Sequence, residues 1–260
     1  MLYYYCMENN EKKFFDNNSD NESNRDLLTG PSTEKQEDDT PWTISQVAAV
    51  MLIAIILANF PIFFAGYAAK PQGILLISLL LQDAALFLLP LFTVHRKYNL
   101  PPSVLGFKPD KVIRFIMIGF LAGLTMYVLQ SFAAILVTVT LPEEWLVQQH
   151  LLTMLAGDIP IFEVIFIVIF VVVFAPISEE TIYRAFLYPP LKKRFGRKRG
   201  IFICGLVFGI IHFNIAVFLP LFVGGLAFAW LYDRYGNIGY NIIAHMVWNS
   251  ISLLIFFLTR

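Results

Sequence analysis

The sequence has few charged residues and almost no cysteine, and both shortages exclude common classes of protein. Only 15% of its 260 residues are charged, whereas 57% are hydrophobic. A soluble domain carries about a quarter charged residues, so this composition indicates a polytopic membrane protein instead. Two cysteines, Cys6 and Cys204, cannot by themselves form a four-ligand zinc site. One lies in a polar stretch and the other in a hydrophobic run, which argues against a disulfide.

The formal net charge of zero hides an uneven distribution. Residues 1–42 hold ten acidic and four basic side chains, so this stretch carries −6 and the rest of the chain +6. Residues 1–41 are rich in Asn, Asp, Glu and Ser and are predicted to be a disordered acidic tail. The other bases lie in short loops between hydrophobic runs, and this arrangement excludes nucleic acid as a partner. The opening residues lack the basic start and apolar stretch of a signal peptide.

From residue 42 to residue 260 the sequence predicts an all-α membrane domain. A bilayer core of about 30 Å needs roughly 20 apolar residues in a helix. We expect a bundle of about seven transmembrane helices, within a range of six to eight: 43–69, 73–94, 112–140, 160–187, 199–213, 216–233 and 238–258. The fifth is short, and one interpretation pairs it with the sixth as a bent hairpin. The polar stretch 141–158 lies at the interface or forms an eighth element.

Loop charge predicts the orientation of these helices. Basic residues flank the second connection, at 96–114, and crowd the fourth, at 192–199, whereas the third connection carries acids and no base. Positive loops stay in the cytoplasm. We therefore expect a protein of the cell membrane with a cytoplasmic N-terminal tail and with residue 260 on the outer side.

Small and aromatic residues predict contacts and boundaries of the helices. The pairs Gly119/Gly123 and Gly205/Gly209 have the spacing that allows close helix contact, although chance explains the first pair equally well. Trp42 lies near the end of a predicted span and is expected in the headgroup layer. The sequence shows no clear internal repeat, so a transporter built from inverted repeats finds no support.

Ionisable residues inside the hydrophobic runs are rare and therefore informative. Each costs roughly 2.5–3.5 kcal/mol on insertion scales, so such a residue usually faces an interior cavity. Asp83, in the middle of the second run, is predicted to form a helix–helix hydrogen bond rather than to act in catalysis. The others, apart from those at span ends, belong to three short motifs.

The first motif, EETIYR, occupies residues 179–184 near the end of the fourth run. Glu180 and Arg184 are four residues apart, so they share a helix face and are predicted to pair. Glu179 lies about 100° around the helix from Glu180 and stays available as a base. Pro176 is expected to kink the helix just before this turn and tilt the turn toward a cavity.

The other two motifs place histidines in later helices. FGIIH puts Phe208 and His212 one turn apart on one face, and HMVWN does the same for His245 and Asn249. Two histidines, an asparagine and a glutamate from separate helices can converge on one polar pocket. Burying such groups without a purpose would cost on the order of several kcal/mol in total. That cost disfavours a purely structural polar network without excluding it.

These residue types indicate hydrolysis by an activated water molecule, because no motif offers a serine or cysteine nucleophile. Glu179 and His212 are the candidates for deprotonating a water held between them. His245 and Asn249 are the candidates for donating hydrogen bonds to the oxyanion that forms on an amide carbonyl. The competing interpretation is a zinc ion held by Glu179, His212 and His245, although the HExxH spacing of zinc proteases is absent.

The motifs EExxxR, FxxxH and HxxxN, in this order in consecutive hydrophobic segments, resemble those of the CAAX protease and bacteriocin-processing (CPBP, or Abi) family. Its eukaryotic relatives include the type II CAAX prenyl endopeptidases. The phrases EETIYRAFLYPPL, VFGIIHF and GYNIIAHMVWNSI carry the resemblance, which covers about residues 165–258. The acidic tail has no counterpart in it.

The resemblance implies a glutamate-dependent intramembrane endopeptidase that needs no metal or other cofactor and whose site opens to the cytoplasm. By motif position, Glu179 and His212 correspond to the family's water-activating pair, and His245 and Asn249 correspond to its oxyanion-stabilising pair. Its supporting residues correspond to Glu180, Arg184 and Phe208. The expected partners are the lipid bilayer and a membrane-associated peptide or protein substrate. The family also includes scaffolds and bacteriocin-immunity proteins, so a non-catalytic protein that binds peptides in this pocket is the alternative. The motifs do not imply a prenylated substrate.

Overall fold

The structure of the protein is a computed structural model that describes residues 40–64, 71–146 and 150–259. The predicted acidic tail, apart from its last two residues, lies outside these ranges. Within them every regular element is a helix and none is a strand, which confirms the all-α prediction.

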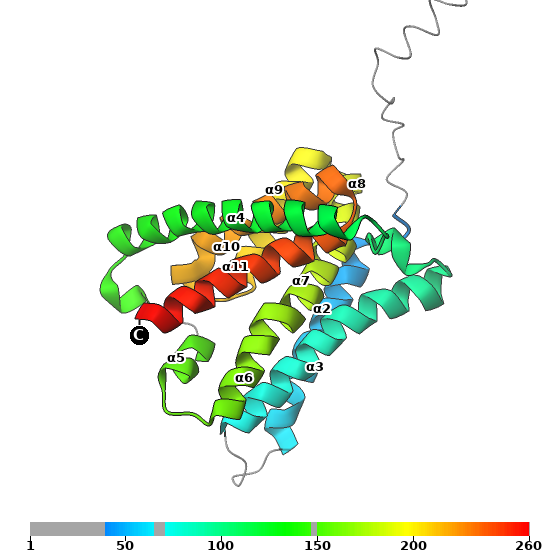
Figure 1. The fold of residues 1–260 in the computed structure, drawn as a ribbon. Coiled ribbons are helices and arrows are strands. Elements are labelled where there is room, and N and C mark those ends of the chain that lie inside the picture. Colours follow the sequence, from blue (N-terminus) through cyan, green and yellow to red (C-terminus); the bar gives the residue numbers. More distant parts are fainter. Residues whose placement is uncertain (1–39, 65–70, 147–149, 260) are drawn as a thin grey trace, which may run out of the picture. The chain divides into compact units, whose positions relative to one another are not determined.

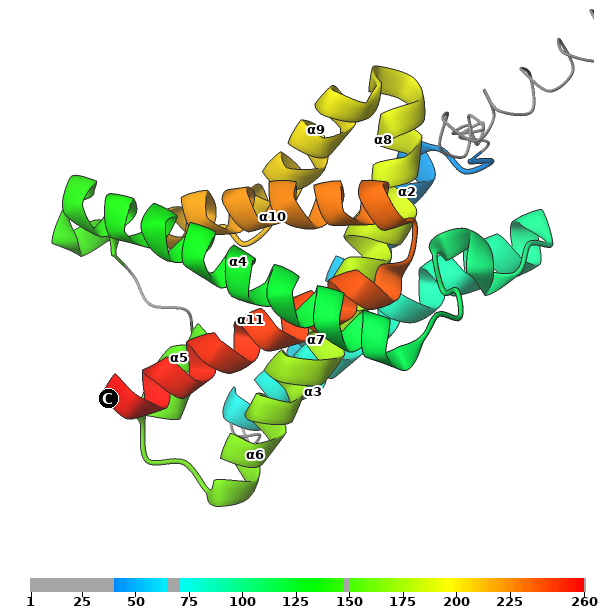
Figure 2. The ribbon, with the colours of Figure 1, turned by 45° about the horizontal axis from the view of Figure 1, so that its top comes forward.

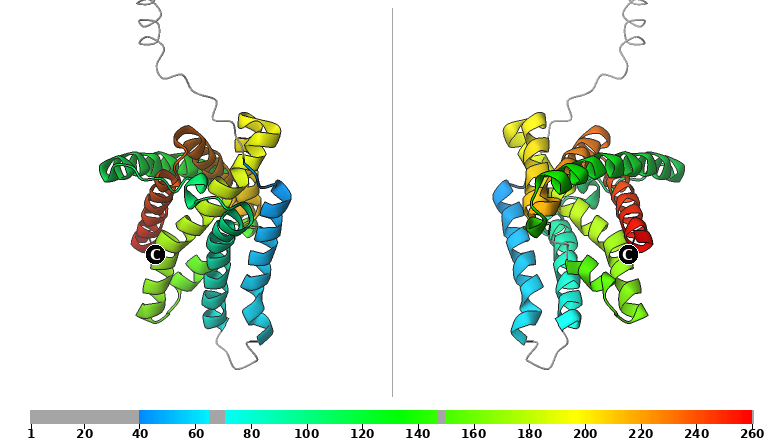
Figure 3. Two further views of the ribbon diagram at one scale, coloured as in Figure 1. Left: turned by 90° about the vertical axis from the view of Figure 1, so that its right-hand side faces the viewer. Right: turned by 90° about the vertical axis from the view of Figure 1, so that its left-hand side faces the viewer.

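The helices pack in pairs around one long, interrupted helix. In Figure 1, α2 (Ile44–Phe64) lies beside α3 (Pro71–Phe92), α4 (Val112–Thr140) lies along α11 (Ile238–Thr259), and α9 (Arg197–Ile210) pairs with α10 (Ile215–Tyr235). The long helix comprises α6 (Ile161–Ile169), η4 (Phe170–Phe174), α7 (Ala175–Glu180), η5 (Thr181–Leu187) and α8 (Tyr188–Phe195). The short elements are η1 (Thr93–Lys97), η2 (Pro102–Leu105), η3 (Glu143–Trp145) and α5 (His150–Ala156). Figure 3 shows α2, α3 and α6 as neighbouring, roughly parallel rods and α4 strongly inclined to them.

Six segments of the described chain are long and apolar enough to cross a membrane, which confirms a multi-pass membrane protein. They are Ile44–Pro61, Gly73–Lys97, Val112–Thr140, Ile161–Phe195, Ile215–Tyr235 and Ile238–Thr259. The fifth predicted span corresponds to α9, which has 14 residues. A helix of that length rises about 21 Å, less than the bilayer core of about 30 Å. This span is therefore too short to cross by itself.

The contacts of Asp233 show that α9 and α10 form the bent hairpin. Its carboxylate accepts hydrogen bonds from Tyr188 at 2.6 Å and from Arg197, and it lies 3.3 Å from the Lys192 ammonium. Arg197 begins α9, whereas Asp233 lies near the end of α10. The second helix of the hairpin therefore returns to the end at which the first one starts.

Pro176 leaves one carbonyl of the long helix without its backbone donor. Just before this proline the helix is a π-helix, in which each backbone N–H donates to the carbonyl five residues earlier. The N–H of Ala175, for example, donates to the Phe170 carbonyl oxygen. In this register the donor for the Val171 carbonyl would be residue 176, but proline has no N–H. The side-chain amide of Asn249 donates to that oxygen at 2.7 Å. Because unpaired backbone groups are costly in a membrane, this bond ties α11 to the long helix.

Pro190 has a similar effect at the other end of the long helix. In α-helical register its missing N–H would have paired with the Phe186 carbonyl. The Trp42 indole donates to that oxygen at 2.8 Å, and its ring stacks on the Phe186 ring with centroids 5.3 Å apart. Only 3% of Trp42 is exposed, and this side chain fixes α2 against the long helix.

Both glycine pairs lie where two helices approach closely. A Cβ atom added at Gly119 or Gly123 would lie 2.6 Å from atoms of α11. One added at Gly205 would lie 2.9 Å from α10, and one at Gly209 would lie 3.1 Å from it. The predicted close contacts are therefore present for both pairs, and Figure 2 shows α4 running close along α11.

Candidate active site

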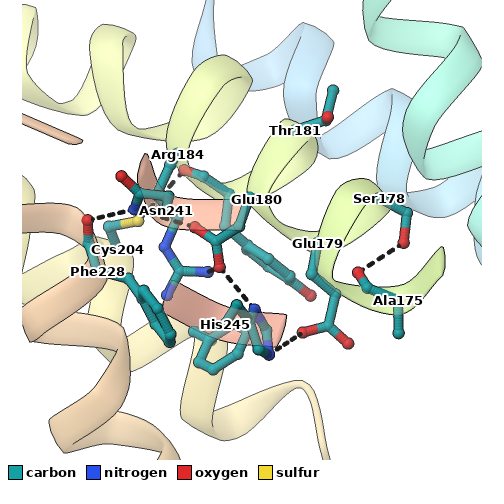
Figure 4. A network of polar contacts seen from close by, with 12 residues as sticks. Ala175, Ser178, Glu179, Glu180, Thr181, Arg184, Cys204, Phe228, Asn241 and His245 are labelled. Carbon is teal, nitrogen blue, oxygen red and sulfur yellow. Dashed lines mark hydrogen bonds and ion pairs between the residues drawn. The ribbon is translucent and has the colours of Figure 1, made fainter. Parts of the chain in front are cut away.

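Glu180 is the centre of a buried polar cluster that joins α7, η5 and α11 (Figure 4). None of its surface is exposed. Its carboxylate accepts hydrogen bonds from Arg184 at 3.0 Å, from His245 at 2.8 Å and from Asn241 at 3.1 Å. The predicted pairing of Glu180 with Arg184 is confirmed, and all four side chains hold one another in place.

The guanidinium of Arg184 lies between two aromatic rings. Its central carbon is 4.3 Å from the centroid of Phe208 and 4.9 Å from that of Phe228. Both rings are fully buried, and a cation over an aromatic face is stabilised further when water is absent. Nε and Nη2 of Arg184 have no hydrogen-bond partner within the described part of the chain. The aromatic faces therefore supply much of the environment of this charge.

Two aromatic rings and two carboxylates surround the His245 ring. Phe228 and Trp248 stack on its ring, with centroids 4.9 and 5.1 Å away and interplanar angles of 29° and 28°. Its Nδ1 lies 2.8 Å from Glu180, and its Nε2 lies 3.9 Å from Glu179. An ionised carboxylate only accepts hydrogen bonds, so the proton of Nδ1 points at Glu180. The orientation of Nε2 toward Glu179 follows from this bond.

The two consecutive glutamates occupy different environments, as the 100° turn between them predicts. The Glu180 side chain is fully buried, whereas 22% of the Glu179 side chain is exposed. Glu180 has its charge balanced by Arg184, but Glu179 faces His245 across a gap that is too long for a direct hydrogen bond. Such a gap suits a group that acts on a molecule placed between them.

His212 lies beyond the end of α9, one turn after Phe208. Its Nδ1 is 2.7 Å from the Phe208 carbonyl oxygen, and its ring meets the Phe208 ring edge to face at 5.2 Å. The Phe208 ring also contacts His245, with centroids 6.3 Å apart. The structure therefore brings both predicted histidines against one ring. It does not join His212 to Glu179 by a hydrogen bond in the described ranges.

Asn249, the fourth predicted residue, lies one turn after His245 and donates to the Val171 carbonyl at 2.7 Å. Asn241, one turn before His245, was missed by the sequence reasoning. Its amide donates to Glu180 and, at 2.8 Å, to the Phe228 carbonyl. The signal that points to it is the spacing of four, because residues 241, 245 and 249 share one face of an apolar helix.

The structure does not gather the three side chains of the zinc interpretation into one group. Across residues 40–64, 71–146 and 150–259, no three side chains of His, Cys, Asp or Glu lie close enough together to hold a metal ion. Glu179, His212 and His245 are therefore not arranged as a ligand set.

The fold and the cluster define a polytopic membrane protein with a polar site enclosed by its helices. Residues 160–251 match the family described as Rce1-like type II CAAX prenyl endopeptidases. This segment contains all three motifs and every member of the cluster around Glu180. The match confirms, for this segment, the family that the motifs resemble. No curated protein and no solved structure matches the chain significantly.

Proposed function

We propose that the protein is an intramembrane endopeptidase that hydrolyses a peptide bond of a membrane-associated peptide or protein with an activated water molecule. The family match over residues 160–251 supports CAAX-type endopeptidase activity in general terms. The observation that carries the specific proposal is the position of His245 between two unlike carboxylates. It lies 2.8 Å from the buried Glu180 and 3.9 Å from the partly exposed Glu179.

Glu179 is the general base in this proposal. A water molecule beside its carboxylate gives it a proton, and the water oxygen attacks the carbonyl carbon of the substrate. When the tetrahedral intermediate collapses, the C–N bond breaks, and the proton held by Glu179 passes to the leaving nitrogen. The exposure of Glu179 supports this role, because water reaches its carboxylate but not that of Glu180.

His245 stabilises the oxyanion in this proposal. Its Nδ1 is held by Glu180, which leaves Nε2 directed toward Glu179 and the site. In this proposal an N–H at Nε2 donates a hydrogen bond to the negative oxygen of the intermediate. Stacking on both faces keeps the ring in this orientation, so little reorganisation is needed during the reaction.

Asn249 and His212 complete the proposed set. The amide of Asn249 has two N–H donors, and the bond to Val171 uses one of them. The second is the proposed donor to the oxyanion. The Nδ1 of His212 is held by the Phe208 carbonyl, which leaves Nε2 to contact the water molecule beside Glu179.

The backbone after α9 supports the presence of water in the site. Residues 211–214 are not helical, and they follow a helix that rises about 21 Å from its start at Arg197. With Arg197 at the cytoplasmic surface, as the proposed orientation has it, this turn falls within the depth of a bilayer core. Non-helical backbone at such depth is tolerated only where protein covers it or where it lines a water-filled cavity. The side chain next to His212, Phe213, is 85% exposed, so protein does not cover the turn fully.

The proposal includes no metal or other cofactor, and it places the N-terminal tail and the mouth of the site on the cytoplasmic side. The lipid bilayer and the peptide substrate are the proposed partners. The basic residues at 192–199, next to the helix that carries Glu179, support this orientation.

The experiment that tests the proposal is a peptide-cleavage assay with the purified protein in lipid nanodiscs. A panel of membrane-associated peptides, with prenylated and unprenylated CAAX peptides among them, is followed by mass spectrometry. We expect new termini with the wild type and none with Glu179→Ala or His212→Ala. Binding of peptides without cleavage by the wild type would contradict the proposal and favour a scaffold or immunity protein.

A further inference from the structure

The turn between α8 and α9 contains basic residues that the proposed mechanism does not use. They occupy positions 192–194 and 197–199, and no acidic residue occurs in the sequence between Glu180 and Asp233. The two helices form a hairpin, and this turn is its tip (Figure 2). The tip of the hairpin is therefore strongly positive.

Asp233, near the end of α10, balances only part of this charge. Its carboxylate lies 3.3 Å from the Lys192 ammonium and accepts a hydrogen bond from Arg197. Three other bases of the turn are exposed and form no ion pair in the described part of the chain: Arg194, Lys198 and Arg199. The last two lie in the first turn of α9, where a cation opposes the helix dipole. The stability of α9 therefore does not explain them.

Two exposed phenyl rings indicate the depth of this turn in the membrane. The apolar segment Ile161–Phe195 ends at the first ring, and Phe195 is 37% exposed. Phe202 is 53% exposed and follows Arg199 by three residues, a rise of about 4.5 Å along α9. Acyl chains stabilise an apolar ring better than water does. The bases beside these rings therefore lie at the level of the lipid headgroups.

This depth favours a lipid headgroup as the partner over a soluble acidic protein. Clusters of Lys and Arg directly beside a membrane span attract anionic phospholipids. An arginine donates two parallel hydrogen bonds to a phosphate, and a lysine contributes a point charge. The guanidinium carbon of Arg194 lies 5.3 Å from the centroid of the Phe195 ring. A cation and an apolar group thus meet at the tip, as a phosphate and an acyl chain meet in a phospholipid.

We propose that the tip of the hairpin binds anionic phospholipids. Arg194, Lys198 and Arg199 hold the phosphate groups, and Phe195 and Phe202 contact the first part of the acyl chains. The membrane orientation inferred from loop charge depends on the summed charge of the cytoplasmic loops. Lipid binding at this surface depends instead on these three bases in this one place, and it does not require proteolytic activity.

Native mass spectrometry of the full chain in detergent, titrated with phosphatidylglycerol, tests the surface. Each Lys or Arg near an anionic lipid contributes about fivefold in affinity. A variant that combines Arg194→Gln, Lys198→Gln and Arg199→Gln should therefore bind this lipid more weakly than the wild type by about tenfold or more. A wild type that binds phosphatidylcholine as tightly as phosphatidylglycerol would overturn the proposal.

The matched control neutralises three exposed bases of the connection between α3 and α4, with Arg96→Gln, Lys97→Gln and Lys111→Gln. It removes the same charge from a different loop and should bind phosphatidylglycerol within about twofold of the wild type. An equal loss of binding in the two triple variants would mean that overall charge, and not this surface, attracts the lipid.

Fluorescence tests the depth of the tip. Phe195→Trp adds an indole there, and its additional emission should be quenched in nanodiscs whose lipids are brominated near the glycerol end of the acyl chains. Additional emission that bromination leaves unchanged would overturn the proposal in favour of a soluble acidic partner. Neither measurement uses cleavage, so a failure here leaves the proposed peptidase function standing, and a protein without proteolysis leaves the lipid surface standing.

Discussion

The Nδ1 atom of His245 lies 2.8 Å from the Glu180 carboxylate, which also holds the Arg184 guanidinium at 3.0 Å. Glu180 is thus the shared acceptor of a histidine on α11 and an arginine on its own helix. Within the described part of the chain, its neighbour Glu179 has no such pair of donors, and it is partly exposed. Adjacent residues of the same type are therefore expected to differ in what they contribute, one to stability and the other to chemistry.

This division predicts opposite results for two neighbouring substitutions. Glu180→Ala leaves Arg184 buried without its counter-charge, and breaking a buried ion pair costs about 3–5 kcal/mol. Glu179→Ala, at a partly exposed position, should change the free energy of unfolding by about 1 kcal/mol or less. Denaturant unfolding in detergent measures both values. Equal losses of stability for the two variants would show that the carboxylates do not differ in this way.

The bond between Asn249 and the Val171 carbonyl predicts a coupling with Pro176. Asn249→Ala leaves that buried oxygen without a donor, at a cost of about 1–3 kcal/mol. Pro176→Ala restores a backbone N–H at the position from which the helix would supply the bond. The double variant should therefore lose less stability than the sum of the two single variants.

Ser250 provides the matched control for this cycle. It is the next residue of α11, is exposed, and bonds only within its own helix, to the Met246 carbonyl among its described contacts. Ser250→Ala combined with Pro176→Ala should give additive changes in the free energy of unfolding. If Asn249→Ala and Pro176→Ala are additive as well, the bond from Asn249 to the Val171 carbonyl does not replace the backbone hydrogen bond that Pro176 cannot make.

The close approach of α4 to α11 predicts that Gly123 tolerates no side chain. A Cβ atom there would lie 2.6 Å from the Ala244 carbonyl oxygen and 2.7 Å from the Val247 side chain. Gly123→Ala should destabilise the protein by about 1–3 kcal/mol through overpacking. Gly73, which has no atom within 4 Å of the same position, is the control. Gly73→Ala should be neutral or stabilising by up to about 1 kcal/mol, because alanine favours the helix.

The metal-independent mechanism predicts that chelators leave proteolysis unchanged. Glu179, His212 and His245 do not form a ligand set in the structure, and the proposed chemistry uses only side chains and water. Dialysis against a chelator, followed by the cleavage assay, should give the same rate as the untreated protein. Loss of activity that added zinc restores would favour the zinc interpretation of these residues.

Much of the polar cluster could be predicted from spacing along single helices. The pairing of Glu180 with Arg184, the contact of Phe208 with His212 and the close helix contacts at the glycine pairs each depend on residues three or four positions apart. Such neighbours lie on one helix face whatever the rest of the fold does. Local periodicity therefore sufficed for them.

The bonds between helices could not be predicted in this way. Trp42 and Asn249 donate to carbonyls that Pro190 and Pro176 leave unpaired. The sequence shows that a proline frees a carbonyl, but it does not show which distant side chain reaches that oxygen. The same limit applies to Asn241, whose role depends on a residue 61 positions away. Only the packing of the helices determines these partners.

The rate of peptide cleavage by Glu179→Gln, relative to the wild type, tests the central claim most directly. Glutamine keeps the shape of the side chain but cannot accept the proton of the attacking water. The account predicts a rate lower by roughly 10²–10⁴-fold in a variant that unfolds like the wild type. Glu144→Gln, at an exposed position of η3, is the control and should cleave at the wild-type rate. Cleavage by Glu179→Gln within a few-fold of the wild type would contradict the account.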